Sequence, residues 1–226
     1  MRKATVLLIL VLAFITVNTA QSQIRFGPKA GFTVSKMYIK TKNNPLYEVI
    51  PGFEIGGVAD IPLDFVMENI SFQPSLLFIS KGYKYEIGDF RTRTRPMYIE
   101  IPMNVMYGIE MDQLKVYAGL GPYIGYGVAG KIKINTIDKA KNKVEVNNKI
   151  NWGPGDADLY KPFDFGGNIN LAFEYGNYLA GFNYSFGLTN ISSKGFVPGN
   201  GDVAGTAAKL KNRCYNFTIG YWFGGE

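Results

Sequence analysis

The 226-residue sequence contains 24 lysines and arginines, 18 aspartates and glutamates, and no histidine. Without histidine, every catalytic site that depends on an imidazole is excluded, which leaves only a Ser-Lys or carboxylate-pair site open to an enzyme. The net charge of +6 is too small to predict a nucleic-acid partner. Cys214 is the only cysteine in the sequence, so the fold has no intrachain disulfide.

The N-terminus has the three parts of a secretory signal peptide. Two basic residues precede an apolar run over residues 6–17, and small and polar residues follow it. The run is shorter than the roughly 20 residues that a membrane-spanning helix needs. We expect residues 1–22 to be the signal peptide, with a cut after Ala20 as the alternative, and residues 23–226 to form one domain.

Apolar residues alternate with small, polar or charged residues in seven stretches of the remaining chain. Because successive side chains of a strand point to opposite faces, each stretch predicts a strand with one apolar face. The stretches are Arg25–Ser35, Pro51–Asp60, Glu68–Ser80, Met97–Ile109, Leu114–Val128, Asp164–Asn190 and Arg213–Phe223. Asp164–Asn190 holds two strands, because Gly176-Asn177 at its centre favours a tight hairpin turn. The sequence therefore predicts eight strands.

The connections between these strands are alternately long and short. The long ones cover residues 36–48, 81–96, 129–162 and 191–212, and the short ones cover residues 61–64, 110–113 and 176–177. An up-and-down barrel of an outer membrane has long outer loops and short periplasmic turns in this order. The pattern places both termini in the periplasm.

A soluble, lipocalin-like barrel with its apolar face inward is the alternative to a membrane barrel. The interior of an eight-stranded barrel only just holds side chains, so it cannot bury this many Phe, Tyr, Leu and Ile residues. The apolar face therefore points to lipid, where a closed barrel still satisfies every main-chain amide. We predict an all-β, eight-stranded antiparallel up-and-down transmembrane β-barrel in a bacterial outer membrane.

Short motifs occur in order along nearly the whole of this predicted barrel. They are Phe26–Gly31, Pro51-Gly52-Phe53 with Gly56, Phe72-Gln73-Pro74 with Ser80-Lys81-Gly82, Tyr98–Pro102, Ala118–Tyr123, Asp164-Phe165-Gly166 with Gly187–Asn190, and Gly220–Phe223. Together they resemble the PorT-like outer-membrane β-barrel family of the Bacteroidetes group. The resemblance implies an outer-membrane barrel and, for the founding type, an accessory of a gliding-type secretion system. The absence of histidine separately leads us to expect no enzymatic activity.

Charged residues of both signs fall on the inward parity of the predicted strands. They are Arg25, Lys29, Glu54, Asp60, Glu100, Lys115 and Glu174. An unpaired charge in a confined lumen is costly, so we expect these residues to form ion pairs that plug it. A path for protons or ions is the alternative, although an open porin needs about 16 strands.

Three arginines precede the fourth predicted strand and share the parity of its lipid-facing residues. If this strand extends upward, Arg91, Arg93 and Arg95 form a row just above the hydrocarbon edge, where charge costs little. Arginine binds phosphate bidentately, so the row predicts contacts with the phosphates of lipopolysaccharide in the outer leaflet. The alternative is a solvated loop, and a bulge at Pro96 would turn the row inward.

The connection Ala129–Pro162 is rich in lysine. Within it, Ile132 and Ile134 continue the alternation of the preceding strand, and Val144 and Val146 resume it. This pattern predicts a hairpin that projects beyond the membrane and attracts an acidic partner or a glycolipid. A solvated loop is again the alternative.

No motif predicts a cofactor or a metal. The glycine-rich stretch Gly119–Gly127 is followed by no helix, whereas a phosphate-binding loop must open one. Asp156 and Asp158 are too few for a calcium site.

Two functional hypotheses remain. The first is a structural or accessory barrel with a plugged lumen that binds surface components or takes part in a secretion assembly. Its partners would be lipopolysaccharide and other envelope or secretion proteins. The second is a narrow porin-like channel for ions or small solutes. Conductance in planar bilayers distinguishes the two hypotheses, because stable single-channel steps would favour the channel.

Overall fold

A computed structural model describes residues 24–40, 47–137, 142–194 and 209–224. Within these residues eleven strands form a single sheet. The strands are β1 (Arg25–Lys40), β2 (Tyr47–Glu48), β3 (Ile50–Pro62), β4 (Ile70–Ser80), β5 (Tyr83–Ile87), β6 (Phe90–Met111), β7 (Leu114–Ile137), β8 (Lys143–Lys149), β9 (Phe163–Tyr175), β10 (Tyr178–Gly187) and β11 (Lys209–Tyr221). The predicted signal peptide lies outside the described residues.

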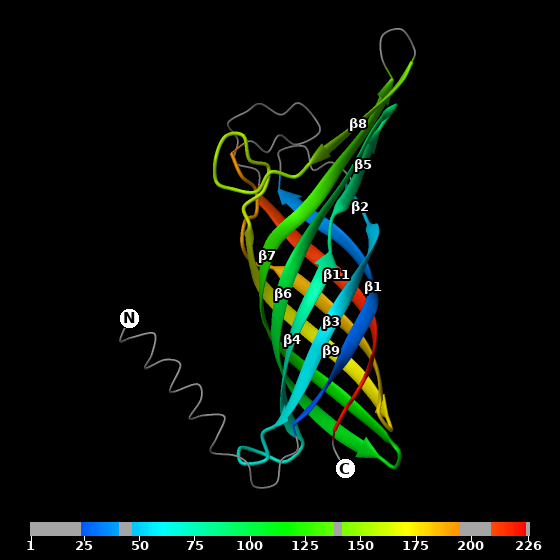
Figure 1. Cartoon of the computed structure of the whole chain (residues 1–226), viewed down its shortest axis with the longest axis vertical. Helices are drawn as coiled ribbons and strands as arrows, with labels where there is room; N and C mark the ends of the chain where they lie inside the picture. The colour runs from blue at the N-terminus through cyan, green and yellow to red at the C-terminus, as the bar shows by residue number, and fades with distance from the viewer. Residues whose placement is uncertain (1–23, 41–46, 138–141, 195–208, 225–226) are drawn as a thin grey trace, which may run out of the picture.

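Eight of these strands close into a barrel (Figure 1). The ring runs β1-β3-β4-β6-β7-β9-β10-β11 and closes because β11 pairs with β1, with every neighbouring pair antiparallel. Each strand therefore pairs with the next barrel strand in the chain. The structure confirms the predicted eight-stranded, up-and-down, antiparallel barrel.

The two faces of the barrel wall have opposite chemistry. Large apolar side chains cover the outside, and some are exposed over most of their surface, with Leu120 at 68% and Ile219 at 72%. Small and polar side chains, such as Thr33 and Asn168, are buried in the lumen. The predicted parity therefore holds in all eight barrel strands. A wall of this kind is stable only in contact with lipid, because water would have to hydrate the whole apolar face.

Aromatic residues lie at both ends of the apolar wall. At one end the rings of Tyr126 and Phe163 lie 5.2 Å apart, and at the other those of Tyr178 and Tyr221 lie 5.3 Å apart. Strand β9 has 13 residues between Phe163 and Tyr175, which spans about 30 Å along the membrane normal at the usual rise and tilt. This distance matches the hydrocarbon core of a bilayer.

The barrel has a turn end and a ribbon end. At the turn end, short connections join the strands, and a positive φ of 54° at Gly176 allows the tight turn between β9 and β10. At the other end β6 and β7 continue beyond the ring, with β5 paired to β6 and β8 paired to β7 (Figure 1). We call β2, β5, residues 90–97 of β6, residues 129–137 of β7, and β8 the ribbon. No helix within the described ranges is long and apolar enough to cross a membrane.

The ribbon corrects the prediction that residues 81–96 form a polar loop. These residues form β5 and the start of β6, joined by a turn in which Gly88 has a φ of 55°. The segment is polar because only one face of it is buried: Tyr83 and Tyr85 pack inward, whereas the alternate residues Lys84 and Glu86 are charged and less buried. Strands β1 and β11 also extend further into this end than predicted. Residues 41–46 of the expected long connection over residues 36–48 lie outside the described residues.

A β-bulge in β7 separates the barrel from the ribbon. Met97 pairs with Ala129 and Tyr98 pairs with Gly127, so Val128 is an extra residue in β7. An inserted residue reverses the alternation beyond it. Ile132, which was expected to stay on the outer face, therefore packs against an inner hydrophobic cluster instead.

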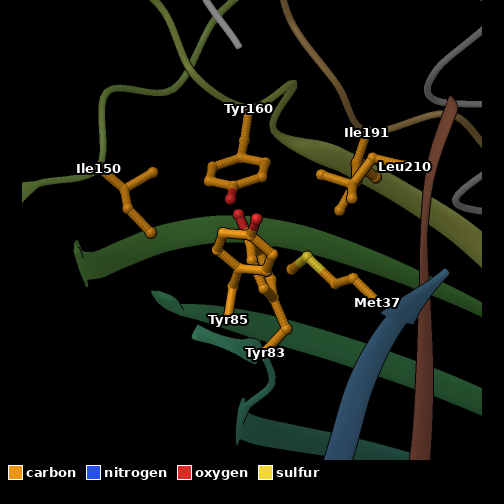
Figure 2. Packing of buried hydrophobic residues seen from close by; sticks show 7 residues of the cluster. All are labelled: Met37, Tyr83, Tyr85, Ile150, Tyr160, Ile191 and Leu210. Carbon is orange, nitrogen blue, oxygen red and sulfur yellow. The ribbon is translucent and has the colours of Figure 1, made fainter. Parts of the chain in front are cut away.

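That hydrophobic cluster, which we call the cap cluster, lies at the ribbon end of the barrel. Figure 2 shows its members, which are Met37, Tyr83, Tyr85, Ile150, Tyr160, Ile191 and Leu210. The hydroxyls of Tyr83 and Tyr160 meet in its centre and hydrogen-bond, and burial raises the pKa of Tyr160 well above its usual value. Trp152 links the cap to the lumen, since its ring lies 6.0 Å from Tyr160 and 5.3 Å from Tyr98.

Candidate functional site

The first candidate feature is a group of charged side chains in the lumen near the turn end. The guanidinium of Arg25 on β1 donates to Asp60 Oδ2 at 2.7 Å and to Glu174 Oε1 at 2.6 Å. Tyr117 and Trp222 donate to Glu174 Oε2 at 2.9 and 3.0 Å, and the guanidinium lies 5.1 Å from the Trp222 ring centre. Because β9 is three strands from β1 in the ring, these contacts cross the lumen.

A second luminal group lies nearer the ribbon end and is centred on Lys81. Its side chain is only 1% exposed; its ammonium pairs with Glu100 and lies 3.6 Å from Asp164 Oδ2. Tyr123 and Asn212 donate to the same Asp164 oxygen at 3.0 and 2.8 Å, and the ammonium lies 4.3 Å from the Tyr123 ring centre. The group joins the end of β4 to β6, β7, β9 and β11.

Between the two groups the lumen holds one looser ion pair and a set of amides. Lys29 Nζ lies 3.8 Å from Glu54 Oε1, and neither carboxylate oxygen of Glu54 accepts a hydrogen bond from the described residues. Asparagine side chains bond across neighbouring strands, for example Asn216 to Asn183 at 3.1 Å. The polar cavity beside them has a volume of about 30 Å³, which is enough for about one water molecule.

The structure places six of the seven predicted inward charges in the lumen, where Glu54 pairs with Lys29 and Glu174 pairs with Arg25. Glu100 pairs with Lys81, which was not among the predicted residues. Lys115 donates to Glu110 at 2.8 Å beside the turn-end opening, and both side chains are partly exposed. Lys81 was missed because it was assigned to a loop. Its parity with the inward residues of β4 was the available signal.

Arg91, Arg93 and Arg95 lie exposed on the outer face of β6. Pro96 does not reverse their direction, because the bulge falls in β7 and not in β6. That bulge brings lysines onto the same outer face: Lys131 pairs with Arg95 and Lys133 pairs with Arg93. The sequence alternation alone had placed these lysines on the opposite face from the arginines.

The strand register arranges the charged and polar residues of the outer face of the ribbon in three rows, with the pair Ile137 and Lys143 lying beyond them, farthest from the barrel. The row nearest the barrel, which we call the basal row, consists of Arg95, Lys131 and Lys149. The middle row consists of Glu48, Lys84, Arg93, Lys133 and Asn147. The outermost of the three consists of Glu86, Arg91, Asn135 and Glu145. The three rows contain seven basic and three acidic side chains, which is an excess of four positive charges.

The acidic side chains of the middle and outer rows all form ion pairs. Lys84 contacts Glu48 at 3.0 Å and Glu86 at 2.9 Å, and Glu86 also pairs with Arg91. Lys133 contacts Glu145 at 2.8 Å. The hydrogen bond from Lys84 lowers the pKa of Glu86, and the hydrogen bond from Lys133 lowers the pKa of Glu145. These carboxylates therefore stay ionised and paired at neutral pH.

The sequence pattern of one protein family, described as outer membrane protein beta-barrel domain, matches residues 19–193. The chain belongs to this family. Its barrel therefore resides in a bacterial outer membrane, as the lipid-facing wall requires. No curated protein matches the sequence. In the described part of this outer-membrane barrel, no group of three or more Cys, Asp or Glu side chains could hold a metal ion.

Solved outer-membrane barrels resemble the structure at low identity. Ail, the attachment invasion locus protein of Yersinia pestis, is 11% identical with a TM-score of 0.41, over 88% of this chain and 98% of its own. Neisserial surface protein A is 9% identical with a TM-score of 0.41, over 90% of this chain and 100% of its own. The N-terminal β-barrel domain of Pseudomonas aeruginosa OprF is 10% identical with a TM-score of 0.32, over 90% and 100%. At such low identities and TM-scores, no partner or activity of these proteins is assigned to this chain.

Proposed function

We propose that this outer-membrane barrel has a structural or accessory role and that its lumen is closed to ions and solutes. The observation that supports this most is Lys81, whose buried ammonium joins Glu100 on β6 to Asp164 on β9 across the lumen. Arg25 makes a second crossing near the turn end. Breaking either set of contacts would leave buried charges without a partner, which costs several kcal/mol. The proposal includes no catalytic activity.

The accessory role that we propose is participation in a gliding-type secretion assembly. The resemblance of the barrel motifs to the PorT-like family supports it, as does a ribbon that projects beyond the barrel and presents a charged face. Lipopolysaccharide and other envelope or secretion proteins are the partners that this role implies.

Planar-bilayer recordings test the closed lumen. We expect the purified wild-type barrel to give no stable single-channel steps, because the two groups of ion pairs occupy the lumen. A large open porin in the same bilayers is the positive control. Stable, reproducible steps from the wild-type protein would contradict the proposal and favour the narrow porin-like channel.

We further propose that the ribbon end faces the outside of the cell and that both termini are periplasmic, after removal of residues 1–22 as a signal peptide. The alternation of long and short connections supports this orientation. Lys143→Cys in β8 and Glu68→Cys between β3 and β4 place exposed thiols at opposite ends of the barrel. The native Cys214 is buried and serves as the unreactive background.

A membrane-impermeant maleimide should label the Lys143→Cys variant on intact cells and label the Glu68→Cys variant only after the outer membrane is permeabilised. The wild-type protein should stay unlabelled in both conditions, because its thiol faces the lumen. The reverse pattern, with labelling of the Glu68→Cys variant on intact cells, would show that the barrel is inserted the other way round.

A further inference from the structure

Four cations in the three rows on the outer face of the ribbon have no acidic partner among the residues that the structure describes. They are Arg93 and the three members of the basal row, Arg95, Lys131 and Lys149. The other three cations of these rows are paired with glutamates. Within the three rows, the unpaired charge is therefore concentrated on the side nearest the barrel.

The basal row is unfavourable on its own. Arg95 lies directly opposite Lys131, which in turn lies directly opposite Lys149. Opposite residues on one face of an antiparallel pair are about 5 Å apart, and like charges at this distance destabilise a sheet. An anion bound across the three strands would remove this repulsion. Arginine offers it a planar fork, and each lysine adds a point charge, which together suit a phosphate group.

The position of the row indicates where the anion comes from. The outer face of the ribbon continues the lipid-facing wall and does not face the barrel mouth: Met97 and Ala129 form the next outward pair below Arg95 and Lys131. Arg95 lies four residues beyond Ile99, which pairs with Tyr126 of the aromatic belt. At the usual rise and tilt this places the row about 10 Å above the belt, level with the head groups of the outer leaflet.

We propose that the basal row binds the phosphate groups of the outer-leaflet glycolipid, with Arg95 as the bidentate ligand and Lys131 and Lys149 as the flanking charges. This inference rests on the proposed orientation, and it replaces the arginine row predicted from the sequence. Arg91 is not part of the site, because Glu86 already neutralises it. Arg93 lies one row further out and supports the site electrostatically.

Two triple variants test the proposal with equal loss of charge. The first removes the basal row through Arg95→Gln, Lys131→Gln and Lys149→Gln. The second removes the three cations that are already paired, through Lys84→Gln, Arg91→Gln and Lys133→Gln. Each purified protein in detergent is titrated with bisphosphorylated lipid A, with dephosphorylated lipid A and with phosphatidylglycerol. Bound lipid is counted by native mass spectrometry, and folding is checked by heat-modifiable mobility.

We expect the basal-row variant to bind bisphosphorylated lipid A at least roughly tenfold more weakly than the wild-type protein, since it loses several charge-assisted contacts. The paired-cation variant should stay within about threefold of the wild type, because surface ion pairs contribute little. Dephosphorylated lipid A should not distinguish the three proteins. Because binding is measured on purified protein, it stays separate from the labelling and conductance tests of the proposed function.

Equal weakening in the two variants would overturn the site, because net charge alone would then explain binding. Wild-type binding that is no tighter for bisphosphorylated lipid A than for phosphatidylglycerol would overturn the choice of glycolipid. A basal-row variant that fails to fold can be replaced by Arg95→Lys, which keeps the charge but loses the planar fork. That variant should still bind several-fold more weakly than the wild type, and unchanged binding would contradict the bidentate role of Arg95.

Discussion

Replacing Lys81 with methionine should lower the free energy of unfolding of the barrel by about 3–5 kcal/mol. The ammonium is buried between Glu100 and Asp164, so its loss leaves two carboxylates in the lumen without a cation. Urea-induced unfolding in lipid vesicles, followed by tryptophan fluorescence, measures the change.

The matched control for this variant is Lys115→Met. Lys115 also lies on the inward parity, but its partner Glu110 is largely exposed, so the loss should stay below about 1 kcal/mol. Adding Glu100→Gln to Lys81→Met should restore part of the stability, because one uncompensated charge is removed. An unfolding midpoint of the Lys81→Met variant that equals that of the wild type would show that the buried ion pair does not stabilise the barrel.

Replacing Arg25 with methionine should destabilise the barrel by a similar amount, about 3–5 kcal/mol. Among the described residues, Arg25 is the only cation in contact with Asp60 and Glu174, and it bonds to them at 2.7 and 2.6 Å. Arg25→Lys should recover only part of the loss, because a single ammonium cannot reproduce the planar fork that bonds to both carboxylates. The same urea titration gives the unfolding free energies of Arg25→Met, Arg25→Lys and the wild type.

Arg213 on the outer side of β11 provides the control for arginine loss. It lies 5.0 Å from the Tyr38 ring centre and has no ion pair within the described residues. Arg213→Met should therefore change the unfolding free energy by less than about 1 kcal/mol. If Arg25→Lys were as stable as the wild type, the bidentate geometry would not matter, and a simple point charge would suffice in the lumen.

The amino-acid sequence by itself determined the barrel, its eight strands and the face on which the residues of these strands lie within the ring. The reason is that strand alternation is local: a residue and its second neighbour share a face whatever the rest of the chain does. Every second residue from Phe165 to Tyr175 could be assigned to the lipid-facing side, because only lipid can cover so continuous an apolar face. The tight turn at Gly176-Asn177 followed from the need for a positive φ.

Only the tertiary structure decided which inward charges meet. Parity places Arg25, Glu100 and Glu174 in the lumen, but it does not tell which strands face one another across it. Ring closure and register bring β1 opposite β9, and they bring the end of β4 close to both β6 and β9. Lys81 is therefore the partner of Glu100. The sequence had predicted that the segment connecting these two residues is a loop.

The ribbon was also decided by tertiary structure. Alternation carried through Val128 would keep Ile132 outward and turn Lys131 inward, and one inserted residue reverses both. The bulge is favoured because it buries the isoleucine against the cap cluster and leaves the lysine exposed. Such an insertion depends on the energy of packing against loops far away in the chain, which a pattern of neighbouring residues does not contain.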